Sequence, residues 1–368
     1  MSSSTSTPQH PQGKKRKLAD GAAGSGAPTA LIRDERVWFA DGNVIVRAGP
    51  GCTGDGPVYG FRCHSSVLAA RSPVFADMFQ LPNAAGDRFE GAECVDLPDD
   101  AEDVRGLLRY LYGSIDMQPL IILRHADTLK VISGPLRLAA KYDMESVTRE
   151  LVPVLERDWP LTYDAWVHAE KGVRLLHSDV PPGEQNHQDP AAAVRLAMDL
   201  RLRAVLPAAF YGLSGLATRR PLRARAHERW ADGALLTPAD VARLTIGRER
   251  VARYLQDTLF RSAEDEIHEI AEEVYHSRER ERDDCAVNLA KWWARAHPTA
   301  AHMYSIGPLA ALKELRDELE SEVPDHDETF EHVCRACRRA FSGELEDEAR
   351  TFWDKLPELF DLESLPFE

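Results

Sequence analysis

The sequence predicts an α+β domain of short strands capped by helices, followed by a mostly α-helical region. Two observations support this prediction. Between residues 37 and 97, short runs of strand-forming residues alternate with turn formers and with short helical segments. From Val104 onward, apolar residues recur at helical spacing and Pro residues follow N-cap residues.

The predicted strands open the ordered part of the chain. Trp38 and the run Val44–Val46 favour strand, and Asp41-Gly42-Asn43 lies between them as a turn. Residues 58–62 form the next strand beyond a Gly/Pro loop, so we expect a hairpin. A further short strand covers residues 94–97.

Helices follow these strands. The apolar residues Val104, Leu107, Leu108, Leu111 and Tyr112 mark one helical face that ends at Gly113. Residues 136–155 predict a further helical stretch, with a break expected near Asp143, that lasts until Pro160. We therefore place a first domain at residues 35–158 and an α-helical region at residues 159–368.

Two helix starts stand out in that second region. Asp189 and Pro190 predict an N-cap and first turn for a helix reaching Val205, with Pro207 as its stop. Thr237 and Pro238 predict the start of another helix, which extends to Leu255.

Composition narrows the classes of function. The chain has 368 residues and a formal net charge of −15, so its surface as a whole repels a nucleic-acid backbone. We expect no direct sequence-specific nucleic-acid binding. The six cysteines are scattered, the N-terminus has no apolar signal segment, and no apolar run is long enough for a bilayer. We expect a soluble intracellular protein with reduced thiols.

Residues 1–30 contain mostly Ser, Thr, Pro, Gly and Ala, a composition typical of a disordered tail. Within it lie Lys14, Lys15, Arg16 and Lys17. A basic run on extended chain predicts a nuclear-localisation signal, and the alternative is a run that only increases solubility. We expect the protein in the nucleus and also in the cytoplasm.

Two motifs resemble catalytic or cofactor-binding motifs, but the residues around them do not fit such a function. The segment from Gly49 to Gly54 satisfies G-x-G-x-x-G, but a strand follows it instead of the helix that a dinucleotide site requires. Ser65 and Ser66 next to His64 lack the surroundings of a nucleophile elbow. We expect no enzyme activity and no cofactor.

Cys334 and Cys337 have the spacing of a metal or redox pair, and Cys285, His297 and His302 could supply further ligands. The apolar periodicity of Phe330, Val333, Cys334, Cys337 and Phe341 instead places both thiols on the apolar face of one helix. Because only this pair is clustered in the sequence, we favour core cysteines and expect no metal. Zinc binding by the pair is the alternative.

Three segments carry a resemblance to a known family. Residues 61–75 read FRCHSSVLAARSPVF, residues 107–113 read LLRYLYG, and residues 136–144 read LRLAAKYDM. In this order and at these distances they closely resemble the BTB/POZ domain. Residues 206–211 and 352–360 look like the helical extension of BTB proteins that are abundant in mushroom-forming (basidiomycete) fungi.

The resemblance implies a non-catalytic module that binds proteins and often forms homodimers through its first helix and N-terminal strand. Asp41 stands where a partly buried acidic residue is common at such a dimer interface, and its alternative is an ordinary turn residue. We expect a dimerising scaffold or a nuclear co-regulator.

A second implied role is that of substrate adaptor for a cullin-3 ubiquitin ligase. In adaptors of this family the third helix often starts with an apolar residue, any residue, and Glu. Here the matching positions are Val104, Arg105 and Gly106, so the glutamate is missing. The cullin-3 role stays open as the alternative.

Overall fold

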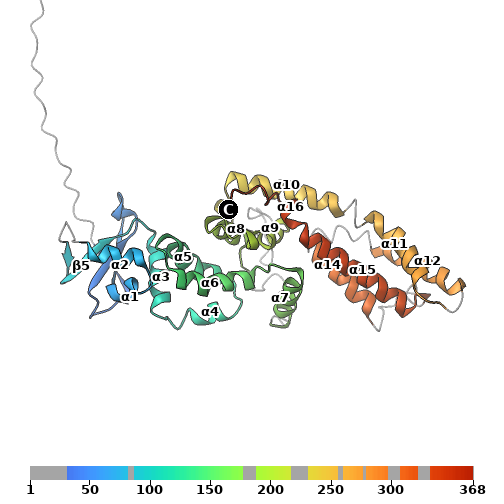
Figure 1. The fold of residues 1–368 in the computed structure, drawn as a ribbon, viewed down its shortest axis with the longest axis horizontal. Helices are drawn as coiled ribbons and strands as arrows, with labels where there is room; N and C mark the ends of the chain where they lie inside the picture. The colour runs from blue at the N-terminus through green and yellow to red at the C-terminus, as the bar shows by residue number, and fades with distance from the viewer. Residues whose placement is uncertain are drawn as a thin grey trace, which may run out of the picture.

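The computed structural model describes residues 31–81, 87–176, 188–216, 231–255, 260–276, 279–296, 307–321 and 332–367. The predicted disordered tail, with its basic run, and both His297 and His302 lie outside these residues. The described part is elongated, with a sheet at one end and long helices at the other (Figure 1).

The strands of the described residues form one sheet in the order β1-β3-β2-β5-β4. They are β1 (Leu31–Trp38), β2 (Val44–Ala48), β3 (Val58–Cys63), β4 (Arg88–Phe89) and β5 (Ala92–Asp96). β2 and β3 are antiparallel, which confirms the predicted hairpin, and η1 (Pro50–Cys52) lies in the loop between them. β1 pairs with β3 in parallel and begins at Leu31, earlier than the sequence indicated.

Six helices follow the strands or lie between them. They are α1 (Ser65–Ala69), α2 (Pro73–Gln80), α3 (Ala101–Leu111), α4 (Gln118–Ile122), α5 (Thr128–Lys141) and α6 (Glu145–Asp158). The predicted apolar face of α3 is confirmed, since its Val104, Leu107 and Leu108 are buried. Asp143, with φ 52°, separates α5 from α6 at the expected break.

The C-terminal region is helical, as predicted. Its helices are α7 (Tyr163–Leu176), α8 (Pro190–Asp199), α9 (Leu206–Ser214), α10 (Pro238–Tyr254), α11 (Phe260–Glu273), α12 (Glu279–Ala296), α14 (Pro308–Glu320), α15 (Arg335–Asp354) and α16 (Leu356–Leu359). Two short 3₁₀ helices accompany them, η2 (Arg203–Val205) and η3 (Gly233–Leu235). Among the described residues, no helix is both long and apolar enough to cross a membrane.

The prediction that Pro207 stops a helix is wrong. The helix that begins at Pro190 ends at Asp199, and Arg201 then adopts φ 57°. Pro207 lies in the first turn of α9, where a missing N–H removes no helical hydrogen bond. Both predicted starts are confirmed: the side chain of Asp189 caps α8 by accepting the N–H of Ala191, and Thr237 and Asp240 form a reciprocal capping box on α10.

One continuous apolar core extends from the sheet into the helical region. It reaches from Val37 in β1 to Leu365, so the helical region packs on the first domain. Polar contacts cross the same junction: Arg137 of α5 lies 3.5 Å from Asp199 of α8. Pro160, expected to end the helical stretch of the first domain, lies between α6 and α7.

Helices α11, α12, α14 and α15 form the end of the molecule opposite the sheet, and we call them the distal arm (Figure 1). Aromatic residues fill its centre. Trp293 meets Phe341 edge to face at 5.5 Å between centroids, and the indole N–H of Trp292 donates to Glu318 Oε1 at 2.9 Å. These contacts join α12 to α14 and α15.

From the distal arm, α15 leads the chain back to the middle of the molecule, where α16 lies beside α10 and α9 (Figure 1). The fully buried Phe360 stacks on Phe210 of α9, with 5.5 Å between centroids. The Phe360 ring also packs against Gly247 of α10. The segment after α15 is therefore part of the core.

Candidate functional site

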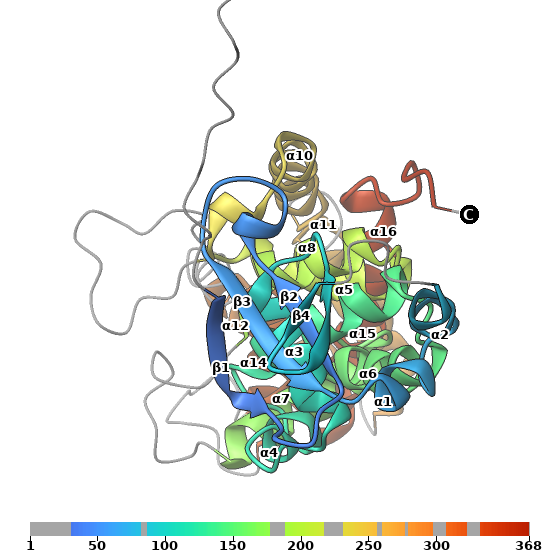
Figure 2. The same ribbon diagram turned by 90° about the vertical axis from the view of Figure 1, so that its left-hand side faces the viewer.

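The open edge of the sheet is a candidate surface for binding proteins. β1, with eight residues, is the longest described strand, and its outer side pairs with no other described strand. Figure 2 shows it at the margin of the sheet. The opposite edge strand, β4, has only two residues. An edge strand offers unpaired backbone N–H and C=O groups to a partner, so β1 is the larger docking edge.

A buried carboxylate shapes this edge. The pairing of β1 with β3 shifts register between Arg33 and Trp38. Inside this irregularity, Asp34 Oδ1 accepts the backbone N–H groups of Arg36 and Val37, each at 3.0 Å. Its second oxygen pairs with Arg105 of α3. These contacts satisfy the backbone groups that the shifted strand leaves without ladder partners.

Asp41, the residue considered for a dimer interface, lies at the surface of the single chain. Its side chain is 85% exposed in the turn between β1 and β2, and its Oδ2 lies 3.4 Å from His64 Nε2. The buried acidic side chain of this region is Asp34. The sequence did not reveal it, because residues 31–36 carry more polar than apolar side chains.

The three positions considered for cullin-3 are all engaged within the domain. Val104 is buried, and Arg105 pairs with Asp34 and with Glu102. A Cβ at Gly106 would lie 3.3 Å from Pro135 Cδ of α5. This glycine therefore lies where α3 and α5 come close together.

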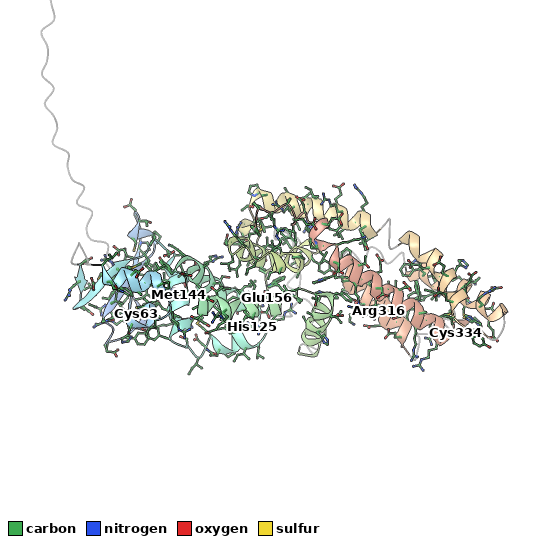
Figure 3. All side chains as sticks on the ribbon, viewed as in Figure 1. Cys63, His125, Met144, Glu156, Arg316 and Cys334 are labelled. Carbon is green, nitrogen blue, oxygen red and sulfur yellow. The ribbon has the colours of Figure 1, made fainter. Side chains whose placement is uncertain are left out.

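The two cysteines of the C-x-x-C pair do not both lie within a helix, although the apolar periodicity predicted that they would. Cys334 is the N-cap of α15, which begins at Arg335, and Cys337 lies in its first turn. Phe330 lies outside the described residues, so the expected apolar periodicity is confirmed only from Cys337 to Phe341, both of which are buried. Figure 3 shows Cys334 at the end of the molecule far from Cys63 of the sheet.

The expectation that only this pair is clustered is wrong. His276, after α11, and Cys285, in α12, join it, and the four possible ligand atoms all lie within 4.8 Å of one another. We call these four residues the Cys3His cluster. His276 Nε2 lies 3.3 Å from Cys337 Sγ and 3.7 Å from Cys334 Sγ. Cys285 was a sequence candidate, whereas His276 was not.

The thiols of this cluster differ in acidity. Burial raises the pKa of Cys285, and burial together with the neighbouring Cys334 raises the pKa of Cys337. Burial also acts on Cys334, but hydrogen bonds from the backbone and side chain of Cys337 outweigh it and lower the pKa of the Cys334 thiol.

The three segments that resemble the family motifs, residues 61–75, 107–113 and 136–144, pack on one another. The Tyr112 hydroxyl, at the end of α3, accepts the backbone N–H of His64 at 2.9 Å. Ser72 caps α2 by accepting the N–H of Phe75 at 3.0 Å, and its hydroxyl donates to the carbonyl of Tyr142 at the end of α5. The rings of Phe75 and Tyr142 lie 4.6 Å apart. The motif residues therefore tie α2, α3 and α5 together around the sheet.

Comparison with known families agrees with this arrangement. Residues 58–158 match the BTB/POZ domain. This domain is a protein-protein interaction module that often dimerises, and in this chain a mostly helical region follows it. A search of curated proteins found no match.

The BTB/POZ domain carries a second exposed feature in the connection between α3 and α5. Three large apolar side chains are exposed there: Ile115 (87%), Ile122 (66%) and Leu123 (61%). Hydrogen bonds anchor the backbone of this connection to α6. The guanidinium of Arg157 donates to the carbonyls of Ile121 and Ile122 at 2.8 and 2.7 Å. Apolar side chains exposed to water on an anchored backbone favour contact with a partner.

Proposed function

We propose that the chain is a scaffold that forms homodimers through the β1 edge of its BTB/POZ domain and binds other proteins as a nuclear co-regulator. The observation that supports dimerisation best is the length and openness of β1. Ile32, in this strand, is 45% exposed and contributes an apolar side chain to the edge. Pairing two such edges hydrogen-bonds their backbone groups and removes apolar surface from water.

A matched pair of substitutions tests the dimer. Ile32→Asp places a charge on the β1 edge, and Ile122→Asp places the same charge on the α3–α5 connection; both isoleucines are exposed. By light scattering, the wild-type chain of 41.1 kDa and Ile122→Asp are expected at twice the chain mass, and Ile32→Asp at the chain mass. A monomeric wild type, or an Ile32→Asp variant that stays dimeric, would refute the proposed interface.

One observation favours the alternative, a cullin-3 substrate adaptor: the exposed Ile115, Ile122 and Leu123 directly follow α3. The same light-scattering experiment is repeated with equimolar cullin-3 N-terminal domain. The scaffold proposal expects no complex. A stable complex that Ile122→Asp abolishes would replace the scaffold role with the adaptor role.

The nuclear part of the proposal depends on the basic run Lys14, Lys15, Arg16 and Lys17. Replacing all four with alanine is expected to move a fluorescent fusion of the full chain from the nucleus to the cytoplasm, because an import receptor recognises clustered positive charge. Replacing the separate basic residues Arg88 and Lys130 with alanine serves as the control. Unchanged nuclear fluorescence in the first variant would contradict the nuclear assignment.

A further inference from the structure

We propose that His276, Cys285, Cys334 and Cys337 bind one Zn²⁺ ion as a structural site in the distal arm. The four side chains come from three separate segments of the arm: the residues after α11, the first half of α12, and the start of α15. Three thiolates and one imidazole are a donor set typical of structural zinc.

The distances fit a tetrahedral ion. With Zn–S bonds of about 2.3 Å and a Zn–N bond of about 2.0 Å, neighbouring S and N ligands lie about 3.5 Å apart and two sulfurs about 3.8 Å apart. In the structure, His276 Nε2 lies 3.3 Å from Cys337 Sγ and 3.7 Å from Cys334 Sγ. All pairs of ligand atoms stay within 4.8 Å.

Surrounding hydrogen bonds orient the ligands for a cation. His276 Nδ1 lies 2.7 Å from the carbonyl of Val274, so its proton is held there and Nε2 presents its lone pair to the thiols. The N–H of Cys334 donates to Cys285 Sγ at 3.3 Å, and the N–H of Cys337 donates to Cys334 Sγ at 3.4 Å. Hydrogen bonds of this kind stabilise thiolates, the form of cysteine that binds metal.

The local charge also fits. Three thiolates and a neutral imidazole around Zn²⁺ leave one net negative charge. Arg335, Arg338 and Arg339 lie in the first turns of α15, and the N-terminus of that helix adds a partial positive charge beside Cys334 and Cys337. Both features favour the charge of the occupied site.

Four protein ligands leave no open position for water or substrate, so the ion would be structural and not catalytic. Cys285 and Cys337 are buried, and Cys334 and His276 are half-buried. Zinc would fix the α11–α12 connection to the start of α15. No ligand of the site belongs to the BTB/POZ domain, so the zinc proposal does not rest on the proposed dimer.

The test compares metal content in three forms of the full chain. Wild type, Cys337→Ser and Cys52→Ser are purified after growth with zinc, and their metals are measured by plasma mass spectrometry. Cys52 is a free cysteine of the η1 loop, outside the cluster, so its variant is a matched thiol control. One zinc per chain is expected in wild type and Cys52→Ser, and a several-fold lower content in Cys337→Ser.

A second readout uses Co²⁺ alone, added to chain stripped of metal. Wild type and Cys52→Ser are expected to show the intense visible bands of tetrahedral cobalt and the ultraviolet thiolate-to-cobalt band, and His276→Ala a weakened, shifted spectrum. Absence of metal and of these bands in folded wild type would overturn the proposal. Equal zinc in Cys337→Ser, iron in place of zinc, or a disulfide among these cysteines would overturn it as well.

Discussion

Replacing Gly247 with alanine is expected to lower the free energy of unfolding by about 3 kcal/mol. The new Cβ would lie 2.0 Å from Phe360 Cδ1 and 2.3 Å from its Cε1. The Phe360 ring is fully buried and stacked on Phe210, so it can make room for the new Cβ only by displacing core side chains. The resulting overpacking exceeds the roughly 1 kcal/mol of helix propensity that alanine gains over glycine.

Urea unfolding followed by circular dichroism measures this effect. Gly343→Ala in α15 is the control, because a Cβ there meets no atom within 4 Å; it should be neutral or raise stability by up to about 1 kcal/mol. In the background Phe360→Leu, which removes the ring, Gly247→Ala should lose much of its cost. An equal cost in both backgrounds would show that the Gly247–Phe360 contact is not its source.

Gly134→Ala in α5 is expected to lower stability by about 2 kcal/mol. Its Cβ would lie 2.7 Å from Asp103 Cα and 2.8 Å from Asp103 Oδ1 of α3. The backbone of α3 cannot move away without disturbing the buried Val104 and Leu107 that follow. The midpoint of thermal or urea unfolding of the purified chain gives the loss.

The neighbouring Gly106 provides a control for Gly134. Its Cβ would approach only the Pro135 ring, with Cδ at 3.3 Å and Cγ at 3.8 Å, so Gly106→Ala should be close to neutral once helix propensity is included. If both substitutions cost the same, the close approach of α3 to α5 at Gly134 would not explain the effect.

Local patterns predicted much of the fold. The hairpin, the apolar face of α3, the break at Asp143 and the cap at Thr237 each depend on residues close together in sequence, and the structure has all four. The prediction that Pro207 ends a helix was wrong because proline is tolerated in a first helical turn as well as after a helix end. The packing of Phe360 under Gly247 was not predictable, since more than a hundred residues separate them.

The candidate sites show the same limit. The C-x-x-C pair was visible because its ligands are three residues apart, but His276 and Cys285 reach it only through the packing of α11 and α12 on α15. Periodicity suggested a core position for Cys334, which in fact caps α15. The β1 edge was missed in part because Asp34 and its charged neighbours do not alternate like a half-buried strand.

The return of the chain from the distal arm has a consequence for synthesis. Arg203, just before α9, donates to the carbonyl of Leu365 at 2.7 Å, and α9 is covered by Phe360. During translation, α8 and α9 are therefore made about 150 residues before the segment that covers them, a delay of roughly 8 to 30 seconds at 5–20 residues per second. The BTB/POZ domain, by contrast, contains its own partners and can fold early. Until the last helices emerge, α9 exposes apolar surface, and this interval is when chaperones would be needed.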